Sequence, residues 1–150
     1  MGPVTGQAAF STRETDWVAE GGPLRSIRWQ VFVEEQRVPA DLEWDEEDGR
    51  SRHILAVAAD GTPVGTGRLL RDGHIGRMAV LAAWRRQGVG SALMRHLLEL
   101  AWQSGHERVV LHAQTHAVGF YRKHGFVPEG EEFMEAGIPH VAMTLRLRLP

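Results

Sequence analysis

The sequence predicts a single-domain α/β fold built on a mixed sheet. Three observations support this prediction: the length of 150 residues, a strand–helix–strand unit in the second half, and hairpins on both sides of that unit. A chain of this length fits one domain with a sizeable core. Because the strand–helix–strand crossover joins parallel strands and hairpins join antiparallel ones, the sheet should be mostly antiparallel with one parallel pair.

The first half predicts a strand, a helix and a hairpin. Residues 13–20 are a candidate first strand, and we expect residues 1–12 to be loosely ordered. Pro23 suits the first turn of a helix, and apolar residues at helical spacing extend that helix to about residue 36. An acidic loop and two strands joined by a tight turn follow, at 40–49, 53–60 and 64–71.

The second half predicts the parallel unit and a final hairpin. The unit consists of strand 74–81, an amphipathic helix at 88–104 and strand 107–113. One side of this helix is apolar, and Gly105 ends it. A short helix and two strands complete the chain, at 117–125, 126–133 and 140–148.

The segment WRRQGVG, at the start of helix 88–104, predicts an anion site. The first amides of a helix are unpaired and carry a partial positive charge. Gly88 and Gly90 lack the Cβ atoms that would keep an anion from these amides. Arg85 and Arg86 add donors that fit phosphate oxygens. We therefore expect a phosphate or pyrophosphate, with a helix start whose arginines are only solvated as the alternative.

Two nucleotide motifs do not fit this segment. The chain has no G-x-x-x-x-G-K-[ST] string. A dinucleotide G-x-G-x-x-G motif would need a small residue at position 93, which is Leu93, and would follow its strand more closely.

The residues around this loop resemble the GNAT superfamily of N-acetyltransferases. RRQGVGSALM, after strand IGRMAV, resembles the family pattern [QR]-x-x-G-x-[GA], and AVGFYRKHGF (117–126) resembles its second signature, A-x-x-F-Y-x-x-x-G-F. VFVEEQRVP (31–39) and EEFMEAGIPHVAM (131–143) further resemble the ElaA-like subgroup. The matches extend over nearly the whole chain from about residue 27.

The resemblance implies one N-acetyltransferase domain over residues 1–150, with acetyl-CoA as co-substrate. In this family the sheet splays between the fourth and fifth strands, and the pantetheine arm pairs with free backbone groups of the fourth. Loop amides hold the pyrophosphate, and Gln114 stands where the family often has an asparagine. The cofactor-binding residues implied are Met78, Ala79, Val80, Arg85, Arg86, Gln87, Gly88, Val89, Gly90, Ser91 and Gln114.

Acetyl transfer to an amine requires a neutral amine, donors for the oxyanion and a proton for the leaving thiolate. Tyr121 matches the family's tyrosine near the sulfur and is our candidate general acid; its alternative role is that of a core aromatic residue. A backbone N–H within 78–80 is the candidate oxyanion donor. Because the chain has no cysteine, the amine should attack the thioester directly.

The general base stays open at this point. The candidates are Glu35, Glu46, His53, His112 and His140. Glu35 and His140 are placed on the substrate side, because they lie in the segments that resemble the subgroup.

Two further features each have competing interpretations. The acidic run 41–48 could steer a cationic amine or could be a solvated loop. His112 and His116 are the closest histidine pair, but they span a strand end and a loop, with no HExxH string and no cysteine. We therefore expect no metal site.

Charge and hydropathy narrow the function further. A net charge of −2 and a pI near 6.4 argue against nucleic acid, and no apolar run is long enough to span a membrane. No secretory leader is evident, so we expect a cytoplasmic enzyme. Its partner should be a small-molecule or peptide amine, and a homodimer is left open. The alternatives are an acyl-CoA-binding sensor without turnover and a nucleotide-phosphate binder.

Overall fold

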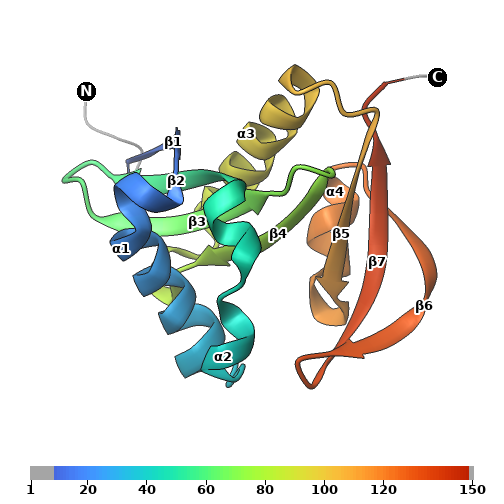
Figure 1. Ribbon diagram of the computed structural model, residues 1–150, viewed down its shortest axis with the longest axis horizontal. Helices are drawn as coiled ribbons and strands as arrows, with labels where there is room; N and C mark the ends of the chain where they lie inside the picture. Colours follow the sequence, from blue (N-terminus) through green and yellow to red (C-terminus); the bar gives the residue numbers. More distant parts are fainter. Residues whose placement is uncertain (1–8, 149–150) are drawn as a thin grey trace.

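The computed structural model describes residues 9–148, which form one mixed sheet flanked by helices (Figure 1). The sheet has seven strands in the order β1-β2-β3-β4-β5-β7-β6, in which β4 and β5 are parallel and their neighbours antiparallel. This confirms the predicted mixed α/β fold. Within residues 9–148, no helix is long and apolar enough to cross a membrane.

The strands are β1 (Phe10–Thr15), β2 (Arg52–Ala58), β3 (Pro63–Leu69), β4 (His74–Val80), β5 (Arg108–Gln114), β6 (Val127–Glu135) and β7 (Ile138–Arg146). The α-helices are α1 (Trp17–Arg28), α2 (Ala40–Glu43), α3 (Val89–Gln103) and α4 (Val118–Lys123). A π-helical turn, η1 (Trp29–Glu35), continues α1, and three 3₁₀ turns complete the set: η2 (Glu46–Arg50), η3 (Ala82–Trp84) and η4 (Thr115–Ala117).

The start of the chain differs from the prediction. The first strand is Phe10–Thr15 rather than 13–20, so residues 10–12 are ordered in the sheet; residues 1–8 lie outside the described part. Helix α1 begins before Pro23, because the Asp16 carboxylate accepts a hydrogen bond from the Ala19 amide at 2.7 Å and caps it. Pro23 lies inside the helix, and the non-helical torsions of Glu20 absorb the kink.

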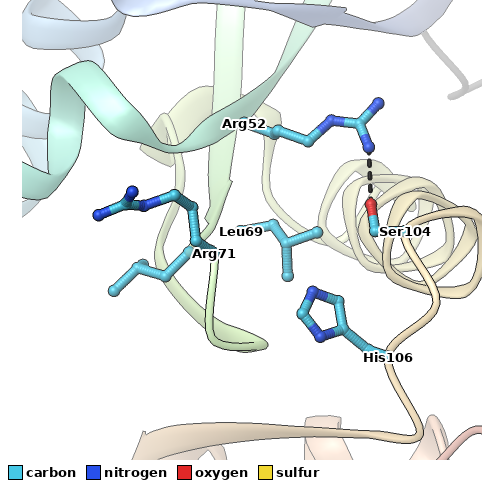
Figure 2. A pocket seen from close by; sticks show the side chains of 6 residues that line it. Arg52, Leu69, Arg71, Ser104 and His106 are labelled. Carbon is cyan, nitrogen blue, oxygen red and sulfur yellow. Dashed lines mark hydrogen bonds between the residues drawn. The ribbon is translucent and has the colours of Figure 1, made fainter.

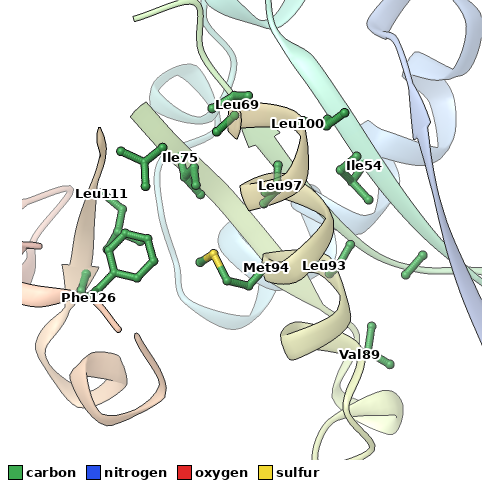
Figure 3. Packing of buried hydrophobic residues seen from close by; sticks show 14 of the residues in the cluster. Ile54, Leu69, Ile75, Val89, Leu93, Met94, Leu97, Leu100, Leu111 and Phe126 are labelled. Atoms are coloured by element: carbon green, nitrogen blue, oxygen red, sulfur yellow. The ribbon is translucent and has the colours of Figure 1, made fainter. Parts of the chain in front are cut away.

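The core lies mainly between α3 and strands β2 to β4 (Figure 3). Leu93, Met94 and Leu97 are fully buried on the predicted apolar face of α3. Gly67 allows the helix to approach β3 closely, since a Cβ there would lie 2.7 Å from the Leu97 Cδ1 atom. On the opposite face of the sheet, α1 packs Leu24 and its apolar neighbours against β2 and β4.

Strands β4 and β5 separate soon after they meet. They pair at His74–Val110 and Ile75–Leu111, whereas β5 stays paired with β7 as far as Gln114. Past Ile75, β4 carries a bulge: the three steps from Gly76 to Ala79 lie opposite two steps of β3, and Arg77 is left-handed with φ +50°. A bulge bends and twists its strand, so β4 turns away and residues 76–80 do not pair with β5.

Buried charges hold this bulge in place. The Arg28 guanidinium donates to Glu43 (Nε to Oε2, 2.6 Å) and to Asp48 (Nη1 to Oδ1, 2.6 Å), and all three side chains are buried. Arg77 Nε lies 3.2 Å from Glu43 Oε2, and Arg68 Nη1 donates to Asp48 at 2.9 Å. The ion pairs therefore connect α1, the acidic run 41–48 and the β4 bulge.

This arrangement corrects both interpretations for Glu43 and Asp48, whereas Asp41, Asp45 and Glu46 of the same run are exposed. Glu43 and Asp48 neither face solvent nor steer a ligand, because Arg28 occupies their carboxylates inside the protein. Burial raises the pKa of Glu43 although Arg28 and Arg77 oppose it. Burial would also raise the pKa of Asp48, but the hydrogen bond and charge of Arg28 outweigh it and lower that pKa.

Replacing Arg28 by alanine should destabilise the fold strongly. The change leaves two buried carboxylates without their main partner, which costs about 3–5 kcal/mol. Urea denaturation measures the loss, with Arg50→Ala as control, because Arg50 is exposed and lies 3.9 Å from Glu47; its loss should stay below about 1 kcal/mol. Equal, small losses in both variants would contradict the role given to Arg28.

Candidate functional site

The loop before α3 has the geometry of an anion-binding turn. Arg86 and Gly88 both adopt the left-handed conformation, with φ +62° and +87°. Gly88 is the N-cap of α3, and no side chain caps the first amides of that helix. The Arg86 side chain is exposed and has no hydrogen-bond or ion-pair partner within residues 9–148. Backbone amides and a free cation therefore meet at one helix start, as the glycine spacing predicts.

Helix α4 packs against this helix start. A Cβ on Gly90 would lie 3.4 Å from the Phe120 ring, so the small residue leaves room for close contact. The His124 Nε2 atom lies 3.1 Å from the Ser91 Oγ atom. Tyr121, next to Phe120, is thereby held near the loop.

The environment of Tyr121 favours a neutral phenol. Its ring packs edge-on against Phe120, with centroids 5.1 Å apart, and against Phe126 at 6.2 Å. Its hydroxyl has no hydrogen-bond partner within the described chain. Burial raises the pKa of Tyr121 to about 12. The hydroxyl therefore keeps its proton at neutral pH, while the ring also serves as a core aromatic.

Arg85 is held by Glu35. Its guanidinium donates two hydrogen bonds to the Glu35 carboxylate, at 2.6 and 2.7 Å, and Nε donates to the Val80 carbonyl at 3.0 Å. The hydrogen bonds from Arg85 lower the pKa of Glu35, so Glu35 is a poor proton acceptor. The pair connects η1 to the end of β4, beside the loop.

A side-chain hydrogen bond connects the end of β5 to the segment that packs on β4. Gln114 Nε2, at the end of β5, donates to Gln36 Oε1 at 2.7 Å, and Gln36 follows η1, which packs on β4. The His116 Nε2 atom lies 2.7 Å from Gln114 Oε1. The structure thus gives Gln114 two side-chain partners at the opening between β4 and β5.

The candidate bases fall into separate places. His53 is buried beside Asp48, the partner of Arg28, with its Nε2 atom 2.9 Å from the Asp48 carbonyl, and burial lowers its pKa. Glu46 is exposed on η2. His112 and His140 instead lie together beside Glu135, a residue that the sequence analysis did not single out.

A shallow hollow of about 230 Å³ lies at the other end of α3 (Figure 2). Its lining includes Arg52, whose Nη1 donates to Ser104 Oγ at 2.8 Å, together with Arg71 and His106. The 15 residues of α3 separate this hollow from the loop by about 22 Å. The Glu14 carboxylate accepts two hydrogen bonds from Arg52, at 2.6 and 2.8 Å, so this arginine of the hollow already has an anionic partner.

Comparison with known proteins identifies the family. The family model for the acetyltransferase (GNAT) domain matches residues 11–147 of this chain. The chain belongs to the GNAT acetyltransferase family. This confirms the resemblance noted above, and the family uses acetyl-CoA or another acyl-CoA as co-substrate.

Relatives and solved structures agree with this assignment. The uncharacterized N-acetyltransferase YjcF of Bacillus subtilis is 46% identical over 122 residues, covering 78% of this chain and 86% of YjcF. Protein ElaA of Escherichia coli is 38% identical over 81% of this chain and 84% of its own length. The crystal structure of ElaA superposes with a TM-score of 0.80 over 91% of this chain and 99% of that chain. An acyl-CoA N-acyltransferase from Pseudomonas aeruginosa gives the same score and coverage at 32% identity.

The raised pKa of the partly buried phenol can be tested directly, because Tyr121 is the only tyrosine. Absorbance near 295 nm should show no phenolate in the folded protein at about pH 10, where a free tyrosine is half ionised. The midpoint should lie near 12. The same protein unfolded in guanidinium is the control and should titrate near pH 10. A midpoint near 10 while circular dichroism still reports the native fold would contradict the burial described for this hydroxyl.

Proposed function

We propose that this GNAT protein is an acetyl-CoA-dependent N-acetyltransferase that transfers the acetyl group directly to a small-molecule or peptide amine. The observation that carries the proposal is the stretch of β4, residues 78–80, that has no partner on β5, next to the uncapped start of α3. The pantetheine arm of acetyl-CoA contains amides that can pair with a strand edge, and its diphosphate can bind the amides of a helix start. The co-substrate therefore needs these two features side by side.

The residues present fit such a co-substrate. The backbone amides of residues 86–91 would bind the diphosphate, and Gly88 has no Cβ to keep it at a distance. The exposed Arg86 side chain would add a positive charge for the phosphate oxygens. Met78, Ala79 and Val80 lie on the edge of β4 that β5 does not cover, where the Val80 carbonyl already accepts from Arg85. Arg85 contributes through its bonds to Glu35 and Val80, which fix the end of β4, and Gln87, Val89 and Ser91 contribute through their amides.

The chain's own groups then supply the chemistry. The amine nitrogen forms a bond to the acyl carbon as the carbon–sulfur bond breaks. A backbone N–H near the β4 bulge stabilises the oxyanion, and the Tyr121 hydroxyl gives its proton to the leaving sulfur. The acylated nitrogen loses a proton in the same reaction, and this proton restores the Tyr121 hydroxyl through water, so the step balances. The neutral phenol is consistent with that role.

A non-catalytic acyl-CoA sensor would use the same backbone groups and would not need a protonated hydroxyl at Tyr121. A nucleotide-phosphate binder would use the loop and leave the β4 edge without a role. Thermal protection by ATP or NAD that exceeds protection by acetyl-CoA would favour this last function.

Replacing Gly88 by alanine should weaken acetyl-CoA binding about tenfold or more, since the left-handed backbone at 88 costs a Cβ residue about 1–2 kcal/mol. Gly90→Ala is the matched control. Residue 90 is outside the left-handed region, and its Cβ would make an ordinary contact with Phe120, so affinity should change less than about threefold. Calorimetry measures both, and equal affinities would contradict the loop's role.

Removing the Tyr121 hydroxyl should lower turnover while leaving co-substrate binding intact. Tyr121→Phe is expected to reduce kcat about a hundredfold, because the thiolate then leaves without its proton donor. Release of free thiol with a panel of primary amines measures kcat, and calorimetry with CoA checks binding. Unchanged kcat would exclude Tyr121 as the acid, and binding by the wild type without any turnover would favour the sensor.

A further inference from the structure

A cluster of two imidazoles and a carboxylate occupies β5, β6 and β7. His112 Nδ1 lies 3.0 Å from Glu135 Oε1, and His140 Nε2 lies 3.7 Å from Glu135 Oε2. Phe133 completes the cluster: it stacks on His140 with centroids 6.0 Å apart and meets His112 edge-on at 5.1 Å. His112 thus meets three residues of the β6–β7 hairpin, whose register pairs Phe133 with His140.

The cluster stands where the parallel strands separate. Leu111 is the last residue of β5 that pairs with β4, and His112 follows it. Its neighbours Leu111 and Ala113 are buried in the core, so His112 lies on the other face of the strand, with a side chain 40% exposed. The site is therefore beside the unpaired part of β4 and open to solvent.

Hydrogen bonding fixes which nitrogen of each ring carries the proton. A carboxylate only accepts, so the short contact to Glu135 assigns the proton of neutral His112 to Nδ1. Nε2 of His112 is left as a proton acceptor. For neutral His140, the Ile138 carbonyl at 2.7 Å only accepts, so the proton of this ring is on Nδ1. Its Nε2 therefore donates no hydrogen bond to Glu135 Oε2, which lies 3.7 Å away.

We infer that His112, oriented by Glu135, removes a proton from the ammonium group of a cationic alkyl amine acceptor bound over this cluster. The inference rests on the proposed N-acetyltransferase function. The N–H bond of the ammonium breaks, its proton moves to His112 Nε2, and the electron pair left on nitrogen forms the bond to the acyl carbon. The proton then passes to water. Glu135 is a positioning residue, and His140 stacks on Phe133 beside it.

The charged surroundings suit a cation. The groups that face or flank His112 are His74 on β4 with its partner Asp72, Glu135 on β6, His140 on β7, and Arg108 on β5, which lies 4.0 Å from Glu129. The exposed carboxylates of Glu131 and Glu132 add negative charge on β6. An ammonium group is favoured here, and an anionic acceptor is not.

The pH dependence of kcat/KM tests the inference, with acetyl-CoA and a panel of alkyl diamines and lysine peptides. His112→Gln should lower kcat/KM about a hundredfold at pH 7. The loss should shrink as pH rises towards the pKa of the amine itself, because a neutral amine needs no base. Glu135→Gln should lower kcat about tenfold and reduce the Nδ1–H population of neutral His112, because an amide fixes that proton less firmly than a carboxylate does. Glu99→Gln, an exposed carboxylate on α3 that accepts only from Gln103, is the control and should leave the rate and the profile in place.

The outcomes separate this inference from the proposed function. If the wild type transfers acetyl groups and His112→Gln keeps the wild-type rate and profile, only the role of His112 is overturned. If the wild type binds CoA but acetylates no amine, both fall. Calorimetry with CoA should give the same affinity for all variants, because none contacts the loop. Nitrogen-15 NMR of the imidazoles should find the Nδ1–H form of neutral His112, and the Nε2–H form would overturn the inference.

Discussion

The bulge at Arg77 is the constraint on which the rest of the site depends. Parallel strands joined by a helix would ordinarily stay paired along their length, and buried backbone groups left without partners are costly. Here one extra residue in β4 bends the strand away from β5 after Ile75. The separation leaves residues 78–80 without a partner on β5, and it places the end of β4 beside the start of α3. The acyl-CoA site that we propose depends on this departure from regular pairing.

The bulge is stabilised from a distance. The left-handed Arg77 contacts Glu43, Glu43 is held by Arg28 at the end of α1, and Trp17 and Trp44 flank the Arg28 guanidinium at 5.2 and 5.1 Å. Closer to the loop, Arg85 joins Glu35 to the end of β4. The charged residues of α1, η1 and the acidic run 41–48 thus hold one wall of the site, whereas β5 to β7 carry the residues of the other.

The sequence predicts what depends on local pattern. The helix start at Gly88 could be predicted because the glycine pair and the apolar helical spacing that follows it are both local features of the sequence. The start of α1 could not be placed, because Gly-Gly-Pro is a stronger turn signal than the single Asp16 cap that decides it. The acidic run reads as a solvated loop because its partners, Arg28 and Arg68, lie 15 or more residues away. Glu135 was missed for the same reason: only the hairpin register places it beside His112.

Amide hydrogen exchange with and without CoA tests the central claim most directly. The account predicts that saturating CoA slows exchange in peptides covering residues 76–91. There, β4 amides without a β5 partner and the first amides of α3 would gain hydrogen bonds. Peptides covering 69–71 and 104–106, at the hollow near the other end of α3, should exchange as before. Unchanged exchange across 76–91, or slowing confined to the hollow, would contradict the claim that the separation of β4 from β5 forms the co-substrate site.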